Sequence, residues 1–247
     1  MERERYQQSL RDDGVALAGA AGANFGRPVP SCPGWNAEDL IRHVGEVHRF
    51  WGTIVGRRLL DPEEVDEDAR PADADLLVWY DEGLADLLEA LRSTEPDVPV
   101  WSWVSPDPVP VLWVDRRMAQ ETAIHRWDGQ DAAGTDQPIA TDIAVDGIDE
   151  FLFQVVGPDP SAVADGAETV RFEAADTGDA WVVRVAHGEL DVRPADRISP
   201  RLPVEATARG SASDLLLLLW RRRRLDALDV RGDPAALARF LVRASLD

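Results

Sequence analysis

The sequence predicts a two-domain protein of the α+β class, with a four-helix bundle in residues 1–140 and an α+β domain in residues 141–247. Two observations support this prediction. Before Gly129, four long segments carry apolar residues at helical spacing and are separated by turn-forming stretches, which is the pattern of a helix bundle. After Gly129, the chain is rich in turn residues and then mixes short β-type runs with helical segments, so the domain boundary is expected in this stretch.

The helices of the predicted bundle are expected at residues 2–24, 36–58, 75–93 and 115–128. The second helix has the clearest start, because Asn36 is a favourable N-cap and Asp39 follows it by three residues. The fourth helix is expected to be capped by Asp115 and stopped by Gly129. The segment 94–114 contains five prolines, which exclude a continuous helix, so it is predicted to be an aromatic-rich loop.

The second domain is expected to combine strands and helices. A helix is predicted at 143–156, another after a cap at Ser211 or Ser213 and through Trp220, and a terminal helix at 234–246. Short runs rich in β-branched and aromatic residues, bounded by turn residues, predict strands at 169–174, 181–186, 189–193, 204–209 and 228–230.

The composition excludes several classes of partner. The chain carries 46 acidic and 26 basic residues and a formal charge of −20, so nucleic acid and anionic membranes would be repelled. Its single cysteine, Cys32, cannot form an internal disulfide, and the first residues lack the apolar core of a signal peptide. The longest strongly apolar run, residues 214–220, is too short to span a bilayer. We therefore expect a cytoplasmic protein that acts on small molecules, as a monomer or weak dimer.

Three polar side chains are predicted to converge inside the bundle. His48 lies about 140° around the second helix from His43, so His43 is expected to face the interior and His48 to face solvent. On the fourth helix, Glu121 and His125 are four residues apart and therefore lie one above the other. Two imidazoles and one carboxylate can bind a divalent metal such as zinc and leave at least one coordination position open.

Spacing alone leaves a structural interpretation of these residues open. Glu121 could instead pair with His125 or with a neighbouring arginine in a network that serves only stability. His48 and His187 are interpreted as surface or turn residues.

Other residues also have both a functional and a structural interpretation. Cys32 precedes a helix whose dipole could lower a thiol pKa, although a small side chain packed at a turn is the simpler interpretation. Trp101, Trp103 and Trp113 could line a ligand cavity or fill the space over the end of the bundle. The basic run 221–224 could be a solvated helix end, or one of its guanidinium groups could bind a substrate carboxylate.

The motifs resemble those of a known family. Residues 29–45, Val-Pro-Ser-Cys-Pro-Gly-Trp-Asn-Ala-Glu-Asp-Leu-Ile-Arg-His-Val-Gly, and residues 121–128, Glu-Thr-Ala-Ile-His-Arg-Trp-Asp, resemble the mycothiol-dependent maleylpyruvate isomerase family of actinobacteria. That family belongs to the DinB-like metal-binding four-helix bundles. Residues 212–222 and 230–233 resemble its second domain, which is similar to sterol carrier proteins. The resemblance spans nearly the whole chain.

The resemblance implies a divalent metal, usually zinc, at the positions that match the family's ligands, which are His43, Glu121 and His125. It also implies mycothiol as a thiol cosubstrate and a catalytic arginine in the second domain, for which Arg222 is the best match. The expected function is isomerisation or S-transfer on a small electrophile, carboxylated or not. The alternatives are a non-catalytic zinc-binding regulatory or stress-response protein and an interaction module whose second domain binds an apolar ligand.

Overall fold

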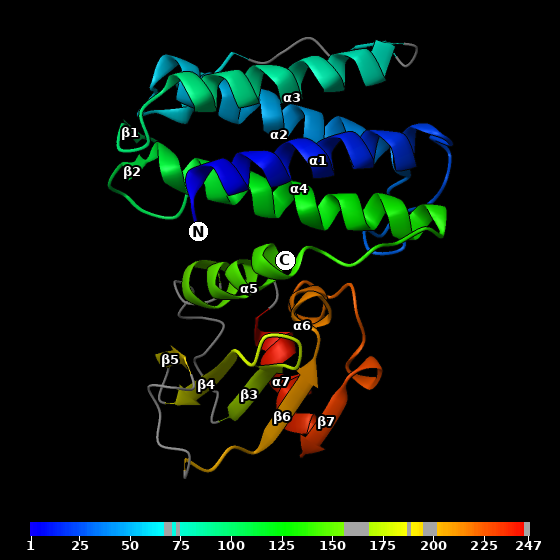
Figure 1. Cartoon of the computed structure of the whole chain (residues 1–247), viewed down its shortest axis with the longest axis vertical. Coiled ribbons are helices and arrows are strands. Elements are labelled where there is room, and N and C mark those ends of the chain that lie inside the picture. Colours follow the sequence, from blue (N-terminus) through cyan, green and yellow to red (C-terminus); the bar gives the residue numbers. More distant parts are fainter. Residues whose placement is uncertain (67–70, 73–74, 156–167, 187–188, 195–201, 245–247) are drawn as a thin grey trace. The chain divides into compact units, whose positions relative to one another are not determined.

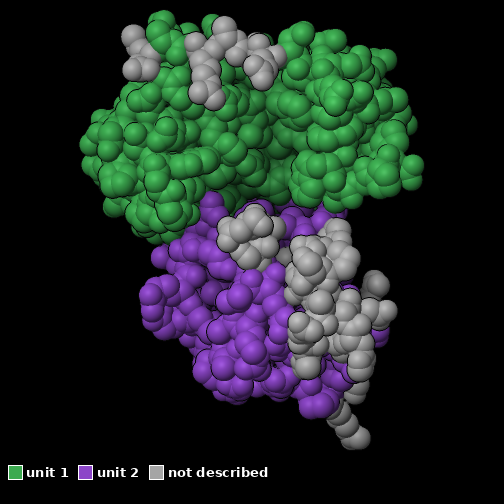
Figure 2. Space-filling view, turned by 180° about the vertical axis from the view of Figure 1, so that it is seen from behind, with its two compact units in different colours: residues 1–137 green, residues 138–247 purple. Residues whose placement is uncertain are grey.

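The computed structural model describes residues 1–66, 71–72, 75–155, 168–186, 189–194 and 202–244. The chain divides into two compact units, Met1–Gln137 and Pro138–Asp247 (Figures 1 and 2). Unit 1 is mainly helical and unit 2 combines a β-sheet with helices, so the predicted two-domain α+β class is confirmed. No helix among the described residues is both long enough and apolar enough to cross a membrane.

Unit 1 is a bundle of four long helices, α1 (Arg3–Gly22), α2 (Ala37–Arg57), α3 (Leu76–Ser93) and α4 (Val111–Ala133). A short 3-10 turn, η1 (Pro62–Glu64), follows α2. Helix α1 packs along α4, and α2 packs along α3 (Figure 1). All four helices contribute wholly buried apolar side chains to one core, including Leu10, Leu17, Leu40, Ile41, Val44, Tyr80, Leu87 and Val114.

The start of α2 is as predicted. The side chain of Asn36 accepts a hydrogen bond from the backbone N–H of Asp39 at 3.0 Å, and the backbone N–H of Asn36 donates to the Asp39 carboxylate at 2.9 Å. This reciprocal capping box satisfies two backbone donors that the helix itself leaves without partners. The turn before it is closed by a hydrogen bond from Val29 N–H to the Trp35 carbonyl at 3.0 Å. The turn therefore has a fixed position against the first residues of α2.

The predicted start of α4 at Asp115 is wrong. The helix begins four residues earlier, at Val111, directly after Pro110. Asp115 is wholly buried inside the helix, where its carboxylate accepts hydrogen bonds from Arg3 and Gln7 of α1, both at 2.8 Å. An aspartate is a good cap, but here its charge is satisfied by side chains of another helix rather than by backbone N–H groups.

The predicted end of α4 at Gly129 is also wrong. Gly129 lies within the helix and faces α1, where an added Cβ would lie 2.8 Å from Cδ1 of Leu17. The helix ends at Gly134, which adopts the left-handed conformation that favours glycine, with φ of 70°. The glycine at position 129 therefore allows close packing of two helices instead of ending one.

The segment 94–114 is not wholly a loop. Strands β1 (Pro99–Val100) and β2 (Val109–Pro110) form a short antiparallel pair, with Val100 opposite Val109. The residues from Val111 onward belong to α4. Prolines exclude a continuous helix but tolerate a short strand pair, because the missing N–H can face outward at an edge.

Unit 2 contains a five-stranded sheet in the order β5-β4-β3-β6-β7. Its strands are β3 (Thr169–Ala174), β4 (Ala180–Ala186), β5 (Glu189–Pro194), β6 (Ala206–Gly210) and β7 (Asp229–Gly232). Neighbouring strands are antiparallel except β3 and β6, which are parallel. The helices are α5 (Thr141–Glu150), continued by a π-helical turn, Phe151–Val155, then α6 (Ala212–Leu219) and α7 (Pro234–Arg243). All the predicted strands and helices of this domain are present.

Helix α6 is a core element of unit 2. It is capped by Ser211, whose hydroxyl accepts a hydrogen bond from the backbone N–H of Asp214, so Ser211 and not Ser213 is the cap. Its five consecutive leucines, Leu215–Leu219, are buried. The turn predicted at His187 lies outside the described residues.

Candidate metal centre

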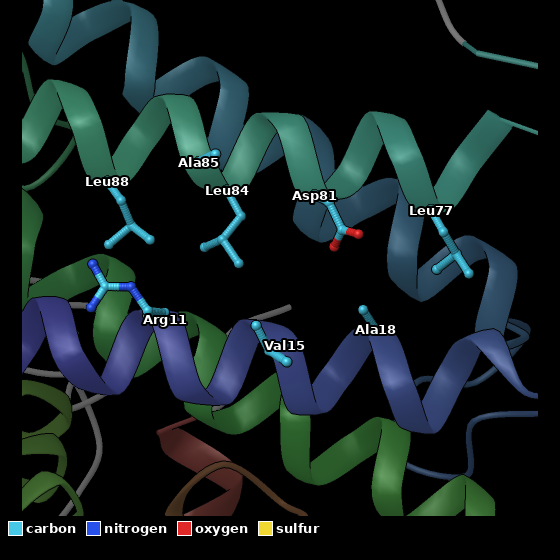
Figure 3. A pocket seen from close by; sticks show the side chains of 8 residues that line it. All are labelled: Arg11, Val15, Ala18, Leu77, Asp81, Leu84, Ala85 and Leu88. Atoms are coloured by element: carbon cyan, nitrogen blue, oxygen red, sulfur yellow. The ribbon is translucent and has the colours of Figure 1, made fainter.

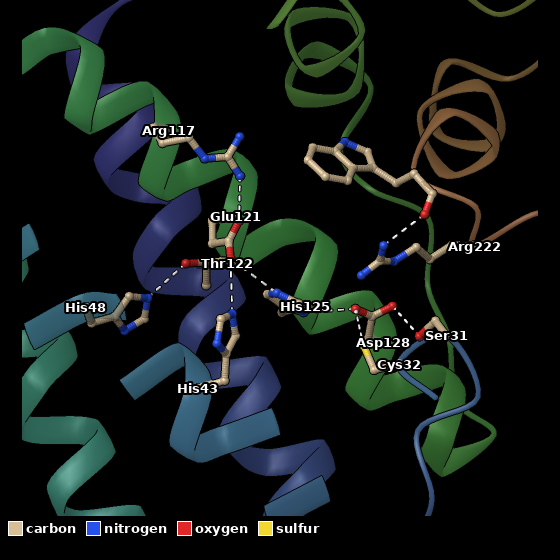
Figure 4. Close-up of polar contacts among 11 residues, drawn as sticks. Ser31, Cys32, His43, His48, Arg117, Glu121, Thr122, His125, Asp128 and Arg222 are labelled. Carbon is tan, nitrogen blue, oxygen red and sulfur yellow. Dashed lines mark hydrogen bonds and ion pairs between the residues drawn. The ribbon is translucent and has the colours of Figure 1, made fainter. Parts of the chain in front are cut away.

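Two helices of the bundle bring three predicted residues together. Helix α2 carries His43, and α4 carries Glu121 and His125 one turn apart (Figure 4). One ligand atom from each of the three side chains lies within 4.8 Å of the other two. The ring centroids of His43 and His125 are 5.2 Å apart, and the rings meet edge to face. The predicted convergence of two imidazoles and one carboxylate is therefore present in unit 1. It does not lie wholly inside the bundle as predicted, since the side chains of His43 and Glu121 are only partly buried.

Glu121 lies at the centre of this group. Its Oε1 atom is 3.2 Å from Nε2 of His125 and 3.5 Å from Nε2 of His43. Its other oxygen, Oε2, accepts a hydrogen bond from the buried guanidinium of Arg117 at 2.6 Å. The two oxygens therefore have different partners: Oε1 faces both imidazoles, and Oε2 binds the arginine.

Glu121 and His125 shift each other's pKa values. Burial on its own would raise the pKa of Glu121, but the hydrogen bond and charge of His125, with His43 and Arg117, hold this pKa well below its usual range. Burial would lower the pKa of His125, but its hydrogen bonds to Asp128 and Glu121 raise the pKa to about 9. At neutral pH, His125 is therefore a cation between two carboxylates.

A second layer of side chains surrounds the histidines. The carboxylate of Asp128 lies 2.9 Å from Nδ1 of His125 and accepts a hydrogen bond from Ser31 at 2.6 Å. The thiol of Cys32 is 3.8 Å from the same carboxylate. The ring of Trp35 lies 4.9 Å from that of His43. Residues of one turn, 31–35, thus contact the surroundings of both histidines.

The donor set fits a divalent metal. Two imidazole nitrogens and one carboxylate oxygen are common zinc ligands, and the carboxylate behind His125 is the usual outer partner of a ligating histidine. The His43 side chain is 36% exposed, so the group is open to solvent on one side. A small ligand could therefore approach an open coordination position from that side.

His48 is not where the sequence predicted it. It is wholly buried, with Nε2 2.9 Å from the hydroxyl of Thr122 and its ring 5.6 Å from that of Tyr80. Burial lowers the pKa of His48 to about 3, so the ring is neutral. The prediction assumed a single interior face, but α2 packs against α3, α4 and α1, so its buried surface extends around more of the helix.

The basic run 221–224 lies in unit 2 just after α6. Arg222 donates a hydrogen bond to the carbonyl of Trp220 at 2.8 Å (Figure 4). Arg223 pairs with Asp214 at 3.1 Å, and Arg224 pairs with Asp226 at 3.1 Å on the surface. The run is therefore not a uniform solvated helix end, because its members have different partners.

The tryptophans of segment 94–114 belong to an aromatic cluster of the bundle. Trp101 stacks on Trp51 with their ring centroids 5.9 Å apart, and the ring centroid of Trp113 lies 5.5 Å from that of Trp51. Trp103 contacts Trp113 but is 53% exposed. Of the two interpretations, space filling at the bundle end fits Trp101 and Trp113.

A separate groove lies between α1 and α3 (Figure 3). It shares no residue with the group around Glu121. Its lining is mostly apolar and consists of Arg11, Val15, Ala18, Leu77, Asp81, Leu84, Ala85 and Leu88. This groove contains no histidine or cysteine and offers no comparable set of metal ligands.

Sequence reasoning overlooked the second layer. Asp128 follows His125 by three residues, so it lies on the same face of the helix, and this spacing was the available signal. Ser31 and Trp35 come from a turn about 90 residues earlier, and no local pattern connects them to α4.

Comparisons with known proteins follow the same two units. Residues 8–130 match the family model described as the mycothiol maleylpyruvate isomerase N-terminal domain, and residues 142–239 match that of the MDMPI C-terminal domain. The chain is similar to the crystal structure of the mycothiol-dependent maleylpyruvate isomerase, with 16% identity and a TM-score of 0.65 over 94% of this chain and 95% of that one. A mutant of that enzyme matches with 15% identity, the same TM-score and the same coverage. None of the curated proteins compared matches the sequence.

Proposed function

This chain belongs to the mycothiol maleylpyruvate isomerase family, and on that basis we propose that it is a metal- and mycothiol-dependent isomerase or S-transferase. Its substrate would be a small electrophile, and a carboxylated one suits the arginine expected in unit 2. The observation that carries the proposal is the meeting of His43, Glu121 and His125 in unit 1, within reach of solvent.

We propose that these three side chains hold a divalent metal, with zinc favoured by the ligand types. Arg117 binds one oxygen of Glu121 and leaves the other directed toward both histidines. When bound, the metal would act as a Lewis acid that lowers the pKa of a thiol in its open position, so that the thiolate forms at neutral pH.

The reaction expected of such a thiolate needs no net consumption of the thiol. The sulfur adds to the double bond of a cis-enedioic substrate, the resulting single bond rotates, and elimination of the sulfur returns the trans isomer. With an alkyl electrophile the sulfur would instead displace the leaving group, and with an epoxide it would break a ring C–O bond whose oxygen takes up a proton, so that in both cases the thiol is retained in a thioether product. Arg222 is the proposed anchor of a substrate carboxylate, because a guanidinium binds a carboxylate through two parallel hydrogen bonds and stabilises a developing enolate.

The alternative of a non-catalytic zinc-binding regulatory or stress-response protein is not favoured by the two family matches. It predicts metal binding without thiol binding. The interaction-module alternative predicts an apolar ligand in unit 2 and no metal in unit 1.

The test begins with elemental analysis of the purified full chain, followed by calorimetric titration of mycothiol into the metal-loaded and the chelator-treated protein. We expect one metal per chain and mycothiol binding only when the metal is present. A spectrophotometric screen with mycothiol and maleylpyruvate-like electrophiles then measures isomerisation and thioether formation separately. Mycothiol binding that is equal with and without metal would contradict the proposal.

Arg222→Ala tests the substrate anchor. We expect the variant to keep its metal but to lose turnover of a carboxylated substrate, mainly through a raised KM. Arg224→Ala is the matched control, because Arg224 is an exposed member of the same run that pairs with Asp226. Equal kinetics of Arg222→Ala and Arg224→Ala would exclude Arg222 as the anchor.

A further inference from the structure

Asp128 is a wholly buried carboxylate that the proposed function does not use. It lies on α4, three residues after His125, and its Oδ2 atom is 2.9 Å from Nδ1 of that histidine. Its Oδ1 atom accepts a hydrogen bond from the hydroxyl of Ser31 at 2.6 Å (Figure 4). Because an unpaired buried carboxylate is costly, these contacts stabilise the Asp128 side chain in this position.

The contact with Nδ1 fixes what the other ring nitrogen can do. A carboxylate accepts a hydrogen bond, so Nδ1 of His125 must carry the proton that is donated to Asp128. Nε2, which lies 3.2 Å from Oε1 of Glu121, is then the nitrogen that would coordinate a metal, which must displace its proton. The negative charge of Asp128 also makes the lone pair of Nε2 more basic.

The turn before α2 holds Asp128 in place. Ser31 donates to one oxygen of the carboxylate, and the thiol of Cys32 lies 3.8 Å from the other. The turn is itself closed by backbone hydrogen bonds between Val29 and Trp35 and between Trp35 and Cys32, both at 3.0 Å. Ser31 therefore donates from a backbone that the turn and the capping box of α2 keep in one position.

We propose that Asp128 is the positioning residue of His125 and that Ser31 holds Asp128 in its working orientation, so that the 31–35 turn sets the metal affinity of the site. This inference rests on the proposed function, because it presumes that His125 is a metal ligand. It adds Asp128 and Ser31, which would influence metal affinity through His125 rather than by binding the metal.

A competing arrangement involves the same atoms. Ligand atoms of Cys32, His125 and Asp128 also lie within 4.8 Å of one another, so these three could themselves bind a metal, with Asp128 as a ligand. The two arrangements differ in the role of sulfur. The competing one needs the Cys32 thiolate, whereas the proposed one does not.

The experiment measures the zinc affinity of the full chain by competition with a chromophoric chelator at fixed pH. Asp128→Asn removes the charge with little change of shape, and we expect it to weaken zinc binding about 10- to 100-fold, as for outer partners of other ligating histidines. Ser31→Ala should weaken binding by a smaller factor, because the carboxylate remains. Asp115→Asn is the matched control, since Asp115 is also a wholly buried carboxylate on α4 but pairs with Arg3 and Gln7 outside the site, and its zinc affinity should be unchanged.

Thermal unfolding of the metal-free variants separates affinity from stability. A purely structural role of Asp128 predicts that Asp128→Asn loses stability and keeps its zinc affinity, which would overturn the inference. A large loss of affinity in Cys32→Ser, with a sulfur-to-cobalt charge-transfer band in the cobalt-loaded wild type, would overturn it in favour of the competing arrangement. A wild-type chain that binds no zinc would remove the proposed function and this inference together, whereas normal wild-type binding with unaffected Asp128→Asn would remove the inference alone.

Discussion

Helices α4 and α6 are both deeply buried in their units, but they bury opposite kinds of side chain. In α6, the buried positions are five leucines, one alanine and one serine. In α4, the buried positions include the polar or charged residues Asp115, Arg117, Gln120, Thr122, His125, Arg126 and Asp128. Burial of a leucine stabilises a fold directly, whereas burial of a charge is tolerated only with a partner.

Two charges of α4 have partners on α1, and others pair within α4 itself. Arg126 pairs with Asp13 of α1 at 3.0 Å, and Asp115 pairs with Arg3 of the same helix. Such a network is a weak source of stability compared with an apolar core of similar volume. The difference between the helices indicates that α6 contributes mainly to stability. The buried polar residues of α4 are better explained by the site that this helix carries.

The largest expected effect is the loss of metal from α4. His125→Ala removes one proposed ligand and leaves a carboxylate and one imidazole, so we expect stoichiometric zinc to disappear from the purified protein. His43→Ala should do the same from α2. Inductively coupled plasma mass spectrometry of the purified variants measures the zinc content.

The control for this prediction comes from the same two helices. His48→Gln replaces a buried histidine that contacts Thr122 rather than Glu121, so zinc content should persist in this variant. Wild-type zinc content in both His43→Ala and His125→Ala would contradict the proposed ligand set.

Truncation of α6 should have the converse result. Leu216 is wholly buried, so Leu216→Ala should lower the free energy of unfolding by about 2–5 kcal/mol, from lost burial and a residual cavity. The zinc affinity of the folded protein should not change. Urea unfolding and chelator competition on one preparation measure both quantities, and a shift in zinc affinity would show that α6 is more than a core element.

A smaller effect concerns the pH dependence of stability. The pKa of His48 is about 3 in the folded protein and about 6.5 when unfolded, so the folded protein binds fewer protons between these values. The stability contributed by the neutral ring is present above pH 6.5 and is lost as the pH falls. We expect the titration of His48 to lower the free energy of unfolding by about 2 kcal/mol between pH 6.5 and pH 4.5.

The measurement compares wild type with His48→Gln by urea unfolding at both pH values. Glutamine does not titrate, so the variant should lose about 2 kcal/mol less than the wild type over this interval. Parallel losses in the two proteins would mean that the buried ring is not kept neutral by its surroundings.

The sequence predicted those features that depend on local spacing. The capping box of Asn36, the strands of unit 2 and the one-turn separation of Glu121 and His125 are all local, and each is present. The errors at Asp115 and His48 have one cause, since both polar side chains are buried against residues far along the chain. A helical pattern assigns polar residues to solvent or to caps, and it carries no information on such distant partners.

The smallest expected effect on stability comes from Gly129, which lies in the polar helix α4. Alanine is favoured over glycine inside a helix by about 0.5–1 kcal/mol. At this position, however, the new Cβ would lie 2.8 Å from Cδ1 of Leu17, a side chain that is itself wholly buried and has little room to move. Overpacking of this kind costs about 1–3 kcal/mol, so Gly129→Ala should lower the free energy of unfolding by about 1 kcal/mol.

The matched control for Gly129 is Gly19 on α1, since an added Cβ there has no neighbour within 4 Å among the described residues. Gly19→Ala should therefore gain stability from helix propensity alone, and the two substitutions should have opposite signs in urea unfolding. If Gly129→Ala were also stabilising, α1 and α4 would have room to separate. The close packing that holds the polar side of α4 against its partners would then not depend on that glycine.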